Sequence, residues 1–122
     1  MKIILTATSP SIDSNIDGRF GRGSYFIVVD PETLECQAHQ NPGVGASGGA
    51  GTLAAQFVAN QRASSVISGD FGPNAYHALQ AVGIAMYLFG ASTTVKEAIE
   101  HFKAGQLERV GTPTGQGHRS RG

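Results

Sequence analysis

The chain has 122 residues, the size of one domain with its own hydrophobic core. Nine basic and nine acidic residues give a formal net charge of zero, so no overall field attracts nucleic acid or an anionic membrane. A single cysteine excludes an internal disulfide, the apolar runs are too short to span a bilayer, and no secretory leader is present, so we expect a cytoplasmic protein.

The first half of the chain predicts three strands. Residues 2–8 are apolar on both faces, which is typical of a strand in the middle of a covered sheet. Residues 9–24 form a long polar loop, and loops of this length usually have a function. Residues 25–30 and 34–41 are two further strands, joined by turn-forming residues at 31–33.

The strand at 34–41 alternates between apolar and polar residues, which predicts an outer strand with one solvent-exposed face. Cys36 lies on the same side as Leu34 and Ala38, so we expect its thiol in the core. His39 falls on the exposed face. Because the edge of this strand is open to a second copy of the chain, we expect a monomer or a weak homodimer.

The second half of the chain alternates helices with strands. Residues 52–61 carry apolar side chains along one helical stripe and follow a glycine-rich connection. Residues 66–68 form a short strand that enters a glycine-flanked turn. Pro73 suits the first position of the next helix, because its missing N–H would be unpaired there, and Gly83 ends that helix.

The last strand is predicted at residues 84–89, and a third helix follows it. Thr94 and Glu97 have the spacing of a capping box at the start of this helix. Residues 1–110 therefore make up one folded domain. Residues 111–122 are polar and rich in glycine, which predicts a flexible C-terminal tail.

The resulting element order is β-β-β-α-β-α-β-α. Short connections make the first three strands antiparallel, and right-handed crossovers make the last two parallel to the first. The sequence thus predicts an α/β protein with a mixed five-stranded sheet and three helices, which is the ribonuclease-H-like architecture.

Several common catalytic and metal-binding patterns are absent from the sequence. A ribonuclease-H-type nuclease needs clustered carboxylates for two metal ions, and the first strand carries no acidic residue. The four histidines are isolated, which excludes a typical zinc site, and one cysteine cannot hold an iron–sulfur cluster. No nucleophile elbow and no Walker lysine are present. We expect no enzyme, and an enzyme that binds phosphate or a nucleotide is the weakest alternative.

Three segments could instead form an anion site at one end of the sheet. One holds two guanidiniums, and the others are glycine-rich helix starts, where N–H groups and the helix dipole favour negative charge. Phe20 and Phe71 would supply apolar walls. An alternative, which stays open, is that the arginines pair with Asp13 and Asp17 and only hold the loop. The candidate residues are Arg19, Phe20, Gly21, Arg22, Gly48, Gly49, Ala50, Gly51, Gly69, Phe71, Gly72 and Asn74.

Four segments, in this order, resemble the dinitrogenase iron–molybdenum cofactor biosynthesis family. They are DSNIDGRFGR at 13–22, GGAG at 48–51, GDFGPNA at 69–75 and TVKEA at 94–98. The resemblance covers roughly residues 1–110. This family includes the nitrogenase cofactor carriers NifX and the C-terminal part of NifB, together with the orange protein, which carries a molybdenum–copper sulfide cluster.

The resemblance implies a small, non-catalytic carrier or scaffold for an anionic metal–sulfur cluster containing molybdenum, iron or both. It implies cluster donor and acceptor proteins as partners. The nitrogenase carriers have a histidine at the position of Arg19, and a protonated guanidinium cannot ligate a metal. We therefore expect Arg19 to hold the cluster from outside its coordination sphere. The alternative is an interaction or regulatory protein of metal-cofactor assembly with no cluster of its own.

Overall fold

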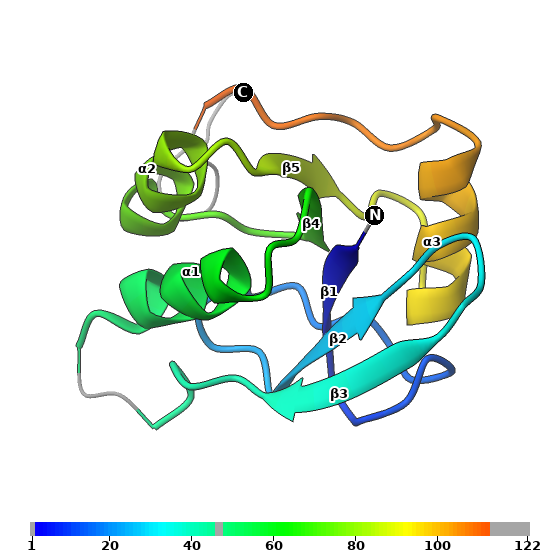
Figure 1. The fold of residues 1–122 in the computed structure, drawn as a ribbon, viewed down its shortest axis with the longest axis horizontal. Helices are drawn as coiled ribbons and strands as arrows, with labels where there is room; N and C mark the ends of the chain where they lie inside the picture. The colour runs from blue at the N-terminus through cyan, green and yellow to red at the C-terminus, as the bar shows by residue number, and fades with distance from the viewer. Residues whose placement is uncertain (1, 46–47, 113–122) are drawn as a thin grey trace.

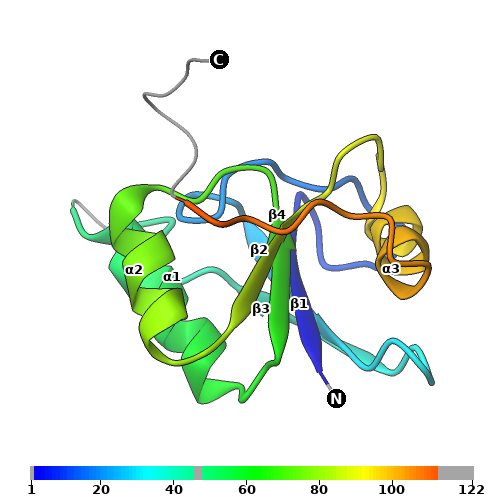
Figure 2. The ribbon, with the colours of Figure 1, turned by 90° about the horizontal axis from the view of Figure 1, so that it is seen from above.

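The computed structural model describes residues 2–45 and 48–112. The strands are β1 (Ile3–Ala7), β2 (Tyr25–Val29), β3 (Cys36–Gln40), β4 (Ser65–Ser68) and β5 (Ala85–Leu88). The helices are α1 (Ala50–Asn60), α2 (Pro73–Ala81) and α3 (Val95–Lys103). The five-stranded sheet lies at the centre, with α1 and α2 on one face and α3 on the other (Figure 1 and Figure 2).

The order of the strands is β3-β2-β1-β4-β5, with β1 in the middle. β2 is antiparallel to both β1 and β3, whereas β4 is parallel to both β1 and β5. This arrangement confirms the predicted α/β class and the mixed sheet. Most of the predicted tail, residues 113–122, lies outside the described residues, and no described helix is long and apolar enough to cross a membrane.

The sheet separates two hydrophobic cores. Ile4 of β1 faces the core under α1 and α2, whereas Ile3 and Leu5 face the core under α3. All five residues of β1 are buried, because helices cover both of its faces. The predicted central strand is therefore confirmed.

The three helices begin in different ways. In α3, Thr94 Oγ1 accepts a hydrogen bond from the N–H of Glu97 at 3.2 Å, and Glu97 Oε1 accepts one from Thr94 N at 3.3 Å. This confirms the predicted capping box. Hydrogen bonds from the backbone N–H groups of Thr93 and Thr94 hold the pKa of the Glu97 carboxyl below its ordinary value. Pro73 is the first residue of α2, as predicted, and α1 begins at Ala50, two residues earlier than expected.

The predicted faces of β3 are wrong. Cys36 is exposed, and His39 is half-buried with its ring centroid 5.2 Å from that of Phe57. The Nε2 atom of His39 is buried without a hydrogen-bond partner among the described residues. Leu34 is also exposed, and its φ of 65° places it in the turn before the strand. The alternation counted from Leu34 therefore assigned the wrong face to the core.

The position of α3 explains why Cys36 is exposed. Cys36 pairs with Val29, whose side chain faces the core under α3. That helix packs on β1 and leaves the edge strand β3 uncovered. The opposite face of β3 carries His39, which pairs with the buried Phe26 and lies under α1.

The chain that follows α3 returns along the outer edge of β5. The N–H of Leu88 donates to Glu108 O at 2.9 Å, and the N–H of Val110 donates to Met86 O at 2.8 Å. Val110 is buried against the α1 and α2 side of the sheet. Within residues 2–45 and 48–112, no segment pairs with the outer edge of β3 in this way.

Candidate functional site

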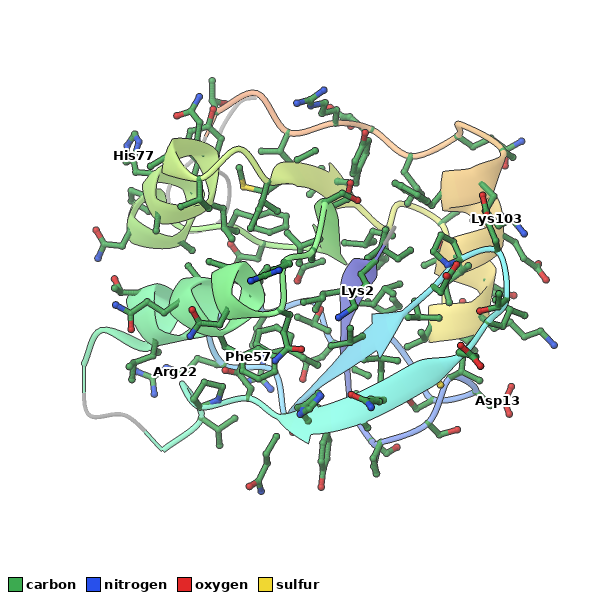
Figure 3. All side chains as sticks on the ribbon, viewed as in Figure 1. Lys2, Asp13, Arg22, Phe57, His77 and Lys103 are labelled. Carbon is green, nitrogen blue, oxygen red and sulfur yellow. The ribbon has the colours of Figure 1, made fainter. Side chains whose placement is uncertain are left out.

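A solvent-open hollow of about 410 Å³ lies where three segments meet: the arginine turn at 19–22, the start of α1 and the start of α2. Figure 3 shows Arg22 beside the start of α1. Here we call this space the hollow. It is lined by Arg19, Phe20, Gly21, Arg22, Ala50, Gly51, Asp70, Gly72, Pro73, Asn74 and Ala75.

The three segments approach so closely because small residues lie at their contacts. A Cβ atom on Gly21 would lie 3.2 Å from the Cα of Gly51, and one on Gly43 would lie 2.5 Å from Gly21 O and 2.7 Å from Ala50 O. Gly51 in turn faces the Cβ of Ala75 in α2, at 3.4 Å from where its own Cβ would be. The glycines of this region therefore bring backbone against backbone, as expected from the sequence.

The helices at the hollow have uncapped starts. The N-cap residues are Gly49 for α1 and Gly72 for α2, so neither helix has an N-cap side chain that accepts a hydrogen bond from its first turn. Neither first turn contains an acidic residue. Because the first N–H groups of a helix lack partners within it and the dipole is positive there, both starts favour an anion.

The arginine turn is organised by the buried carboxylate of Asp17. Its Oδ1 accepts from the backbone N–H of Arg19 at 3.0 Å and from Arg19 Nε at 3.2 Å, and its Oδ2 accepts from Nη2 at 3.3 Å. This side-chain hydrogen bond, together with the charge of Asp17, raises the pKa of Arg19. The predicted alternative of an arginine held by an acidic residue is thus correct for Arg19 and Asp17, although Arg19 also lines the hollow.

Four of the twelve candidate residues do not line the hollow. Phe71 is fully buried, with its ring centroid 5.4 Å from that of Phe20, so it belongs to the core. Gly69 packs elsewhere, because a Cβ atom there would lie 2.6 Å from Phe89 Cε2. Gly48 and Gly49 are exposed and precede the first turn of α1.

Sequence reasoning missed three lining residues, namely Asp70, Pro73 and Ala75. Asp70 matters most, because its carboxylate adds a negative charge to a site expected to bind anions. Its position between two candidate residues, Gly69 and Phe71, was the available signal. The backbone of Asp70 also closes the site, since Asp70 O accepts a hydrogen bond from the N–H of Phe20 at 3.4 Å.

The described residues contain no group of three or more His, Cys, Asp or Glu side chains that could hold a metal ion. Cys36 pairs with Val29, at the end of the sheet where β1 begins, whereas the hollow lies beyond the end of β4. Asp70 is the one residue of these four types in the described lining of the hollow, which does not fit a bare metal ion.

Residues 1–105 match the family described as "Dinitrogenase iron-molybdenum cofactor". Among solved structures, the apo form of the orange protein from Desulfovibrio gigas is 37% identical, with a TM-score of 0.87 over 93% of this chain and 95% of that one. A putative NifB protein from Thermotoga is 29% identical, with a TM-score of 0.80 over 95% of this chain and 98% of that one. Comparison with curated protein sequences gave no match. The resemblance inferred from four short segments is confirmed, and the chain belongs to the dinitrogenase iron–molybdenum cofactor family.

Proposed function

We propose that this protein is a small, non-catalytic carrier or scaffold that binds an anionic metal–sulfur cluster in the hollow. The observation that supports this most is the convergence of two uncapped helix starts and two arginines on one space of about 410 Å³. The description of the family and the likeness to the orange protein support a cofactor-binding or assembly role.

The cargo we propose is a preassembled cluster of molybdenum, iron or both, with sulfide ligands of its own. Sulfide on such a cluster carries negative charge and accepts hydrogen bonds. The guanidiniums of Arg19 and Arg22 and the backbone N–H groups of both helix starts would serve as donors. Arg19 would act from outside the coordination sphere, because the hydrogen bond with Asp17 favours its protonated form.

The charges at the hollow favour binding of an anion by directed hydrogen bonds over binding by net electrostatic attraction. The lining holds two arginines and one acidic residue, Asp70, and Arg19 is already paired with Asp17. Two arginines and two aspartates therefore give these four side chains a formal net charge of zero. Affinity for an anion would depend on the number and direction of N–H groups, which fits a bulky cluster with several acceptor atoms better than a small ion.

Visible absorption tests this proposal. The apo-protein is mixed with tetrathiomolybdate and a copper(I) salt and then desalted, and its spectrum is recorded. The wild type should retain a chromophore, and Arg19→Ala/Arg22→Ala should lose most of it. Lys96→Ala/Lys103→Ala on α3 removes the same charge away from the hollow and should behave as the wild type does. No retained colour in the wild type, or equal colour in the arginine variant, would contradict the proposal.

The second candidate function is an interaction or regulatory protein of cofactor assembly that holds no cluster itself. The presence of Asp70 among the lining residues favours it, because the negative charge of this residue opposes an anion. Cluster donor and acceptor proteins would be its partners in either case, and we place both roles in the cytoplasm. Anaerobic purification from the host with elemental analysis separates them: metal that travels with the protein supports the carrier, and a protein partner without metal supports the alternative.

A further inference from the structure

Asp17 and Arg19 form a pair in which one side chain is hidden and the other is presented to solvent. The side chain of Asp17 is 8% exposed, and that of Arg19 is 66% exposed. Asp17 engages Nε and Nη2 on one side of the guanidinium. A guanidinium has five N–H donors, so both donors of Nη1 and the second donor of Nη2 are left for a ligand.

Asp17 itself is fixed from the middle of the sheet. Its N–H donates to Thr6 O at 3.0 Å, and Thr6 Oγ1 donates to Asp17 O. Since the single hydroxyl proton of Thr6 is used there, the 2.9 Å contact between Thr6 Oγ1 and Ser68 Oγ must have Ser68 as its donor. Thr6 in β1 and Ser68 in β4 are fully buried. A chain of hydrogen bonds thus leads from two central strands to the exposed guanidinium.

Close packing around the turn limits other positions for this carboxylate. The N–H of Gly23 donates to Arg19 O at 2.7 Å, and a Cβ atom on Gly23 would lie 3.3 Å from the Cγ of Asp17. The turn from Asp17 to Gly23 therefore closes around the carboxylate and holds it against the backbone of Arg19.

We propose that Asp17 is a positioning residue for the hollow: it fixes the guanidinium of Arg19 before an anionic thiometallate arrives, and the affinity depends on this orientation more than on charge. The inference rests on the proposed function, which supplies the thiometallate cargo. Asp17 would act on the binding of this cargo through Arg19, without touching the cargo itself. A fixed guanidinium loses less side-chain freedom on binding than a mobile one, which is the general advantage of preorganisation.

The substitution Asp17→Asn separates orientation from charge, because the two make opposite predictions. It removes a negative charge near the hollow, so charge alone predicts tighter binding of tetrathiomolybdate. It also places an amide NH₂ against the guanidinium donors, so loss of orientation predicts weaker binding. We expect the dissociation constant to rise by roughly 2- to 10-fold, the range for ordering one flexible side chain. Equal or tighter binding by Asp17→Asn would overturn the inference.

Asp13→Asn is the matched control, since it makes the same change of charge in the same loop at an exposed position. Asp13→Asn should leave the dissociation constant for tetrathiomolybdate unchanged or slightly lower. A second variant covers the case in which Asp17→Asn does not fold. Arg19→Lys keeps the positive charge but loses the forked donors, and it should also weaken binding. In the Arg19→Lys background, Asp17→Asn should cause no further loss, because the two residues act as one unit.

Nuclear magnetic resonance of the protein without any anion tests the positioning by itself. The Nε–H proton of Arg19 should exchange slowly with water in the wild type and rapidly in Asp17→Asn. Rapid exchange in the wild type would overturn the positioning role. If this proton is protected but the wild type binds no thiometallate, the proposed function is wrong. The proposed dependence of the affinity on Asp17 is then wrong as well. The finding that Asp17 fixes the guanidinium of Arg19 would still hold.

Discussion

Gly21 in the arginine turn lies directly against Gly51 in the first turn of α1, with 3.2 Å between the Cα of Gly51 and the position of a Cβ atom on Gly21. This contact ties the loop after β1 to a helix thirty residues later in the chain. The shape of the hollow therefore depends on backbone contacts, and substitutions at these glycines should act through shape.

Gly43→Ala should be the most disruptive of the glycine substitutions at the hollow. Its methyl group would lie 2.5 Å from Gly21 O and 2.7 Å from Ala50 O, and backbone atoms cannot move aside as a flexible side chain can. We expect a loss of about 1–3 kcal/mol in the free energy of unfolding, as for other overpacked sites. Urea denaturation measures it. Gly45→Ala should leave the stability near that of the wild type, because its Cβ would meet no described residue within 4 Å other than its chain neighbours.

Phe71→Ala should destabilise the protein by about 3–5 kcal/mol, the usual cost of deleting a buried aromatic ring. Phe71 is fully buried and packs against Phe20. Because it does not line the hollow, the milder Phe71→Leu should retain the thiometallate chromophore while its unfolding midpoint in urea falls. A loss of colour in a folded Phe71→Leu protein would place this ring in the site after all.

The side chain of Thr94, as the N-cap of α3, should stabilise the folded protein. Thr94→Ala should lower the free energy of unfolding by about 1 kcal/mol, the typical effect of losing an N-cap side chain. Thr93→Ala is its control, since it keeps the backbone N–H that donates to Glu97 Oε1 at 2.7 Å. Urea denaturation at neutral pH compares the two variants. An equal loss in both would contradict the role of Thr94.

Glu97 gives the pH dependence its sign. Folding lowers the pKa of its carboxyl below the ordinary value of 4.5, so the charged form stabilises the folded state. This contribution is complete above pH 4.5 and disappears as the pH falls through the lowered pKa. The difference in stability between the wild type and Glu97→Gln should therefore shrink under acid. Urea denaturation at a series of pH values measures it, and a constant difference would contradict the prediction.

Cys36 should react as an exposed thiol. A thiol reagent such as 5,5′-dithiobis(2-nitrobenzoic acid) should modify it in the native protein at a rate close to that in the unfolded chain. Cys36→Ser should change the stability by less than about 0.5 kcal/mol, as expected at a surface position. It should also leave thiometallate retention unchanged. Protection of the thiol in the native state would favour the original placement of Cys36 in the core.

Local sequence chemistry was sufficient to predict most of the fold. The apolar run of β1, Pro73 at the start of α2 and the Thr94–Glu97 capping box each have a cause within a few residues of the chain. The prediction for β3 failed because elements far away in the chain decide which of its faces is buried. Whether Cys36 or His39 is covered is decided by the positions of α3 and α1, which alternation along one strand does not contain.

The candidate site was predicted at the level of segments and less well at the level of side chains. The arginine turn and both helix starts do meet, because their glycines permit close backbone contact. The direction of single residues was not predictable. Phe71 turns into the core, while its neighbour Asp70 lines the hollow, and the sequence gives no local rule that separates them.

The strand-like return of residues 108–110 along β5 has a consequence for where the chain can be shortened. The family match ends at residue 105, yet Val110 is buried and Tyr76 Oη donates to Gly111 O at 2.8 Å. A truncation at residue 105 would remove this backbone pairing and expose the edge of β5 to other chains, which invites aggregation. We therefore expect that the shortest version of the chain to fold on its own extends through Gly111, six residues past the end of the family match.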